Sequence, residues 1–134
     1  MKRILLSFIL ITSTISMFSQ KSVPSDAAIL KLMNVKRGMA TVNSLINEMP
    51  KSLDTKKSIE FKRLLNSNKM DLINTSIRTF KAEYTAKEID FIYNECTSDI
   101  IDYSDLTNNF FKKWRHLKGE LFFGKAKQLY SKYK

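Results

Sequence analysis

Apolar residues recur at helical spacing along residues 59–84, and this run constrains the fold more than any other feature. Most of its steps are three or four residues, which places the side chains on one face of an α-helix. The apolar residues are Ile59, Leu65, Leu72, Ile73, Ile77, Phe80 and Tyr84. Asp54 or Thr55 supplies a start, so the sequence predicts one long helix. The polar stretch 66–68 (Asn-Ser-Asn) predicts a kink or a break within it.

Shorter helices are expected on both sides of the long one. Ser25 or Asp26 begins the first, and Asn34 caps a second over residues 35–49 that Pro50 ends. Another helix follows Thr85, and an irregular stretch over residues 97–105 comes after it. A fifth helix is expected next, and a last helical stretch follows Gly119 and Gly124. The expected inward-facing residues are Ile29, Leu32, Met33, Met39, Val42, Leu45, Ile46, Met49, Ile89, Ile92, Tyr93, Cys96, Leu106, Phe110, Phe111, Trp114, Leu117, Leu129 and Tyr130.

The scarcity of turn-forming residues supports an all-α fold. The chain of 134 residues contains three Gly and two Pro, too few for the many turns of an all-β domain. We therefore expect a compact bundle of five or six helices with a long third helix. Residues 20–134 are the right length for a single helical domain with one core.

The N-terminus predicts a cleaved signal peptide over residues 1–19. Lys2 and Arg3 precede an apolar run over residues 4–18, which as a helix would reach only ~22 Å. That is short of the roughly 30 Å of a bilayer core, although an uncleaved anchor is the alternative. The expected location is therefore outside the cytoplasm, either periplasmic or secreted.

The segment 84–89 predicts a tight corner between the long helix and the next one, forming a helical hairpin. Thr85 and Glu88 have the spacing of a capping box, in which each side chain bonds the other residue's amide. Tyr84 and Ile89 flank the box where a hydrophobic staple forms. This corner is structural and is not expected to be an active site.

Residues 28–100 resemble an exported bacterial helical family known as domain of unknown function 2059. The resemblance is carried by Tyr84, Thr85, Glu88 and Ile89, which match its F/Y-T-x-x-E-L/I corner, and by Ser98 in a later F-Y-x-S-P-x-G segment. The sequence departs from that later segment at Glu95, Cys96, Asp99 and Ile101. The resemblance implies an all-helical fold and export, and it brings no established activity and no catalytic residues.

The charge is distributed unevenly along a chain whose formal net charge is +10. Residues 83–105 contain seven acids and one lysine, whereas residues 110–134 contain eight bases and one acid. One interpretation is that the basic helices of residues 110–134 pack beside the acidic helix that follows Thr85. The acids of that helix have the spacing of a solvated face. The other is that residues 110–134 form a surface for an anionic partner, with aromatic and basic residues interleaved. Its candidate residues are Lys112, Lys113, Trp114, Arg115, Lys118, Lys125 and Lys127.

Other candidate chemistry is sparse. His116, the only histidine, lies among cations and is expected on the surface rather than on a metal. The lone Cys96 cannot form an intramolecular disulfide, and it is either buried and inert or a site for pairing between chains. A Cys96–His116 nucleophile pair lacks a nucleophile elbow or a Gly-rich turn, so no catalytic, cofactor or metal site is expected.

These patterns favour an exported, non-enzymatic protein that acts through an unknown protein or envelope component. The alternative is a peripheral binder of an anionic membrane or polymer through residues 110–134. Nucleic acid ranks lower as a partner, because an exported protein rarely meets it.

Overall fold

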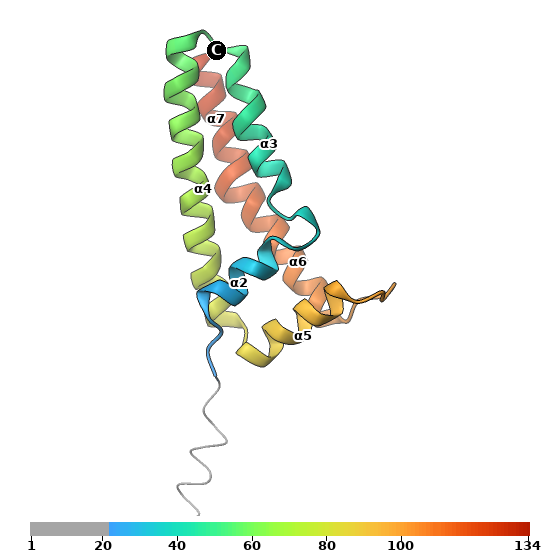
Figure 1. Cartoon of the computed structure of the whole chain (residues 1–134). Helices are drawn as coiled ribbons and strands as arrows, with labels where there is room; N and C mark the ends of the chain where they lie inside the picture. Colours follow the sequence, from blue (N-terminus) through green and yellow to red (C-terminus); the bar gives the residue numbers. More distant parts are fainter. Residues whose placement is uncertain (1–21) are drawn as a thin grey trace, which may run out of the picture.

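The computed structural model describes residues 22–134, which are helical throughout their regular structure and contain no strand (Figure 1). The helices are α2 (Asp26–Met33), α3 (Ala40–Glu48), α4 (Thr55–Glu83), α5 (Ala86–Thr97), α6 (Asp105–Lys118) and α7 (Gly124–Tyr133). Two 3-10 turns, η1 (Val35–Arg37) and η2 (Met49–Ser52), flank α3, and a π-helical turn, η3 (Gly119–Phe123), joins α6 to α7. The predicted all-α fold is confirmed. The predicted signal peptide lies outside the described residues.

Helix α4 organises the molecule by packing against α3, α6, η3 and α7. The segments α6, η3 and α7 form one continuous helix that returns along α4, so the C-terminus lies where α4 begins (Figure 1). At the opposite end, α2 packs on α4 and α5, and α5 packs on α6. When α6, η3 and α7 are counted as one helix, residues 22–134 form five helices, in agreement with the prediction. None of these helices combines the length and the apolar character needed to cross a bilayer.

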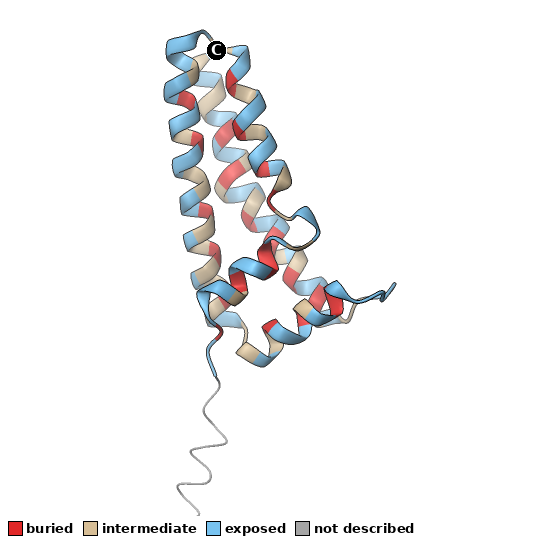
Figure 2. Cartoon of the chain, viewed as in Figure 1, coloured by how far each residue is buried: buried red, intermediate tan, exposed pale blue. Residues whose placement is uncertain are grey.

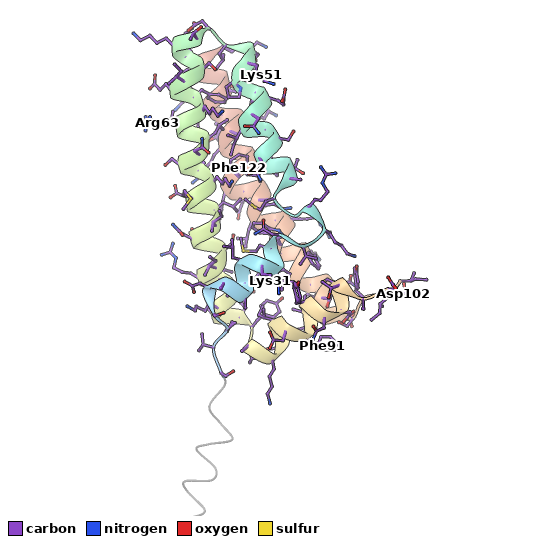
Figure 3. All side chains as sticks on the ribbon, in the orientation of Figure 1. Lys31, Lys51, Arg63, Phe91, Asp102 and Phe122 are labelled. Carbon is purple, nitrogen blue, oxygen red and sulfur yellow. The ribbon has the colours of Figure 1, made fainter. Side chains whose placement is uncertain are left out.

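The core runs along the inner faces of these helices (Figure 2). Phe122 lies in its middle, between α4 and the helices around it (Figure 3). The prediction for Ile59 is wrong, because its side chain is 69% exposed and Phe61 is buried instead. The other large, fully buried side chains are Ile29, Leu32, Met33, Leu65, Leu72, Phe80, Ile89, Ile92, Phe110 and Trp114.

The predicted interruption of the long helix does not occur. Helix α4 continues through residues 66–68, and the Asn66 side chain donates to the Lys62 carbonyl at 3.0 Å. Leu65 and Leu72 are both fully buried on either side of this stretch. Core packing therefore outweighs the weak helix propensity of three consecutive polar residues.

The two C-terminal glycines also lie within a helix, although the sequence suggested that they separate two helical segments. Gly119 and Gly124 both have helical backbone angles. The buried residues step from Phe110 to Trp114, Leu117, Phe122 and Ala126, so one step is five residues long. The wider π-turn over residues 119–123 accommodates that step and returns Phe122 to the core.

The corner at residues 84–89 forms where it was predicted. The Glu88 amide donates to the Thr85 hydroxyl at 3.2 Å, and the Thr85 amide donates to the Glu88 carboxylate at 3.0 Å. Ile89 is buried, and the Tyr84 ring packs edge-on against Phe110 with centroids 5.6 Å apart. Helix α5 leaves the corner across the end of the bundle instead of running antiparallel along α4 (Figure 1). Its buried face packs on α2 and α6, which brings the start of α6 beside the α2–α3 connection.

Candidate functional site

The helix predicted over residues 35–49 is broken at its start, and this correction creates the candidate site. Asn34 ends α2 and its side chain donates to the Leu30 carbonyl, so it does not cap a following helix. Lys36 and Arg37 both have left-handed backbone angles, with φ values of 53° and 59°. Helix α3 then begins only at Ala40. We call residues 35–38 the basic turn.

The left-handed conformation of the basic turn is held by contacts with α6. It costs roughly 1–2 kcal/mol per non-glycine residue, and such strain persists where surrounding contacts enforce it. The Trp114 indole donates to the Met33 carbonyl at 3.2 Å, just before the turn. The Lys118 ammonium donates to the Gly38 carbonyl at 2.9 Å, at its end. Two side chains of one helix thus fasten both ends of the turn.

Between the basic turn and α6 lies a pocket of about 600 Å³, which we call the basic pocket. Two cations come from the turn and three from α6, and none of the described residues that line the pocket is acidic. Uncharged polar side chains from Thr41, Tyr103, Asn108 and Asn109 complete the wall, together with the apolar Val35, Phe111 and Trp114. The five cations are Lys36, Arg37, Lys112, Arg115 and Lys118.

The positive charge of the basic pocket is not neutralised within residues 22–134. None of the five cations belongs to an ion pair there. Aromatic rings offset part of the charge, since Lys36 lies 4.1 Å from the Tyr103 ring centroid and Lys118 5.0 Å from that of Trp114. Burial, and then the neighbouring Arg115, lower the pKa of Lys118 below its ordinary value. A concave site lined by one sign of charge concentrates counter-ions, so the pocket favours an anionic group.

The predicted anionic-partner surface is therefore only partly assembled. Lys112, Arg115 and Lys118 follow each other at three-residue steps and reach the basic pocket together. Lys113 points to another side of α6 and lies 3.4 Å from Glu83. Lys125 lines a separate hollow with Asp26 and Asp71, and Lys127 is exposed on α7.

Trp114, predicted as part of the anionic-partner surface, is not an exposed residue. Its side chain is 1% exposed and packs in the core with Phe80. The residue nevertheless lines the basic pocket, where the Lys118 ammonium lies 5.0 Å from its ring centroid. Its role is to hold the basic turn through the bond to Met33.

Lys36 and Arg37 were missed as site residues because a continuous helix would have placed them on an exposed helix face. The sequence signal for the break was the pair Asn34 and Gly38. Both residue types are typical of helix ends, and the pair brackets Lys36 and Arg37. Their placement depends on α6, about eighty residues later in the chain.

The acidic segment is also arranged differently from the prediction. Among the described residues, Lys113–Glu83 is the one ion pair that joins residues 83–105 to residues 110–134. Glu95, expected on a solvated face, is 7% exposed. Its carboxylate accepts hydrogen bonds from the Ser104 amide, from the Ser104 hydroxyl at 2.9 Å and from the Thr107 hydroxyl at 3.3 Å. Glu95 therefore fixes the start of α6, the helix that carries three cations of the pocket.

The remaining candidates for chemistry lie apart. Cys96 is free and buried in α5, whereas the His116 side chain is exposed with its Nε2 atom 3.3 Å from Glu120. Residues 22–134 contain no group of His, Cys, Asp and Glu side chains placed to hold a metal ion.

Cys96 is expected to react slowly with thiol reagents in the folded protein. Burial raises the pKa of the thiol above its ordinary value; Lys36 opposes the shift and Glu95 adds to it. A raised pKa leaves less reactive thiolate at neutral pH, so labelling should be about 100-fold slower in native protein than in urea and should accelerate as pH rises. A thiol introduced by Ser67→Cys on the exposed face of α4 provides the control. Equal labelling rates for the two thiols would contradict a buried Cys96.

Comparison with family models, with curated proteins and with solved structures gives no match for this chain. The resemblance of residues 28–100 to domain of unknown function 2059 therefore stays a prediction.

Proposed function

We propose that this chain is an exported, non-enzymatic helical protein that holds an anionic group of an envelope component in the basic pocket. The observation that carries the proposal is the convergence of five cations, from two distant segments, around one hollow without a lining carboxylate. The strained backbone at Lys36 and Arg37 supports it, because strain of this kind is concentrated at functional sites.

Burial of the aromatic residues favours a discrete anionic group over a membrane surface. Adsorption to a bilayer requires exposed apolar side chains beside the cations. Phe110, Trp114 and Phe122, three of the aromatic residues that suggested such a segment, lie in the core, and Phe111 and Phe123 are half-buried. The cations of α6 also line a pocket and do not spread over a flat face.

Removal of three pocket charges tests the proposal. The combined variant Lys36→Gln, Arg37→Gln and Arg115→Gln is expected to weaken the binding of tripolyphosphate by about tenfold or more, because charge-assisted hydrogen bonds are lost. The matched control replaces three exposed lysines of α7 by glutamine: Lys125, Lys127 and Lys132. It should weaken binding by less than about threefold, since exposed charges at a distance are screened. Isothermal titration calorimetry at about 0.15 M salt, where the Debye length is about 8 Å, measures both affinities.

Equal losses of tripolyphosphate affinity in the two variants would show that net charge, and not the pocket, attracts the anion. No binding by the monomeric protein would contradict the proposal. Co-sedimentation with vesicles that contain anionic lipid tests the membrane alternative separately. Vesicle binding that depends on the α7 lysines but not on the three pocket residues would favour that alternative.

A further inference from the structure

The loop between α5 and α6 carries two exposed isoleucines between two acidic residues. Ile100 is 48% exposed and Ile101 is 95% exposed, with Asp99 and Asp102 exposed on either side. The loop projects away from the helices, and Asp102 lies at its outer end (Figure 3). We call residues 99–102 the acidic tip.

The acidic tip continues into a small apolar hollow. Phe91, which is also exposed, lines this hollow of about 230 Å³ together with Asn94, Glu95, Ser98 and Ile100. Scattered exposed apolar residues are ordinary, but a contiguous group of them indicates a contact surface. Because carboxylates flank the isoleucines, the complementary surface should be cationic and partly apolar.

The basic pocket of the same fold has this composition and lies next to the tip. Tyr103 directly follows the tip and lines the pocket, where Lys36 stands over its ring. Among residues 22–134, however, neither Asp99 nor Asp102 forms an ion pair with a cation of the pocket. The chain therefore does not fill its own pocket with its own tip. Two adjacent surfaces of opposite charge thus have no ion-pair partner among the described residues.

We propose that the acidic tip of one copy occupies the basic pocket of a second copy, and that the acidic tip of the second copy occupies the basic pocket of the first. A two-fold axis near Tyr103 would place each tip in the pocket of the other copy at the same time, because the tip and the pocket of one copy are neighbours. The carboxylates would face Lys36, Arg37, Lys112 and Arg115, and the isoleucines would lie against Val35 and Phe111. This inference rests on the proposed function, since it requires that the pocket accepts anionic groups, and it names an acidic peptide segment as one occupant.

Sedimentation velocity of the purified protein over a dilution series tests the inference. At low salt the protein should sediment with twice the monomer mass, and high salt should dissociate it. The variant Asp99→Asn with Asp102→Asn should weaken the dimer by about tenfold to 100-fold, because it removes charges from two symmetric contacts. The control Glu60→Gln with Asp71→Asn removes two exposed acids of α4 and should leave the dimer unchanged.

Charge reversal gives a sharper result. A tip variant with Asp99→Lys and Asp102→Lys should be monomeric, and so should a pocket variant with Lys36→Glu, Lys112→Glu and Arg115→Glu. Mixed together they should form a heterodimer, because the reversed tip meets the reversed pocket and the two unmodified surfaces also meet.

A monomer at every concentration in low salt would overturn the inference, as would a dimer that is insensitive to the tip variants. Assemblies that keep growing with concentration would overturn the reciprocal arrangement, because a tip-to-pocket contact that does not close produces open chains. Tripolyphosphate binding by the Asp99→Asn and Asp102→Asn variant separates the two proposals. If this variant binds tripolyphosphate and the unmodified protein is monomeric, the proposed function holds and the dimer inference fails. If this variant does not bind tripolyphosphate, the proposed function and the dimer inference both fail.

Discussion

Replacement of Gly38 by alanine is expected to lower the free energy of unfolding by roughly 2–4 kcal/mol. A Cβ atom at this position would lie 2.0 Å from the Met33 carbonyl oxygen, which is backbone and cannot rotate away, and 3.2 Å from the Trp114 indole nitrogen. Relief of the overlap must move the basic turn away from α2 and α6. That movement would break the bond from Lys118 to the Gly38 carbonyl and would open the pocket.

Urea unfolding followed by the fluorescence of Trp114, the one tryptophan of the chain, measures this loss. Gly119→Ala is the matched control, because a Cβ at position 119 meets nothing within 4 Å and the residue is already helical. The control should be stabilised by about 0.5–1 kcal/mol. Similar effects of the two substitutions would contradict the close approach at Gly38.

Replacement of Glu95 by alanine is expected to lower the free energy of unfolding by about 2–4 kcal/mol. Its buried carboxylate accepts bonds from the Ser104 amide and from the hydroxyls of Ser104 and Thr107. Loss of the carboxylate leaves these donors without that acceptor, and an unsatisfied buried donor costs about 1–3 kcal/mol. Amide hydrogen exchange should also become faster at the start of α6 than elsewhere, because the first turn of the helix loses its anchor.

Asp90→Ala provides the comparison for this second substitution. Asp90 is an acid of the same helix, but it is exposed, so its removal should change stability by no more than about 0.5 kcal/mol. If Glu95→Ala were equally mild, with no local increase in exchange, Glu95 would not anchor α6.

Helix starts and inward faces could be predicted because their causes are local. Ser25 and Asp54 accept from amides three residues later, and Thr85 and Glu88 bond each other across the same spacing. Each cap is contained within four consecutive residues and is therefore visible in the sequence. The buried faces of α2, α5 and α6 follow from apolar periodicity for the same reason.

The basic pocket could not be predicted because its causes are distant in the chain. The left-handed turn at Lys36 and Arg37 depends on Trp114 and Lys118, which become its neighbours only after the bundle forms. Glu95 was assigned to a solvated face because the acids of its segment have the spacing of one, and an acid is rarely buried unless it has partners. Its partners are the Ser104 and Thr107 groups, which a loop of irregular structure brings back to it.

The central claim is that the cations of the basic turn and of α6 act together as one anion site. Titration of the isotopically labelled protein with tripolyphosphate, followed by amide chemical shifts, tests it most directly. We expect the signals of residues 35–38 and 112–118 to shift with a single affinity, while those of residues 125–132 stay in place. Shifts spread along α7, or separate affinities for the turn and for α6, would contradict the account.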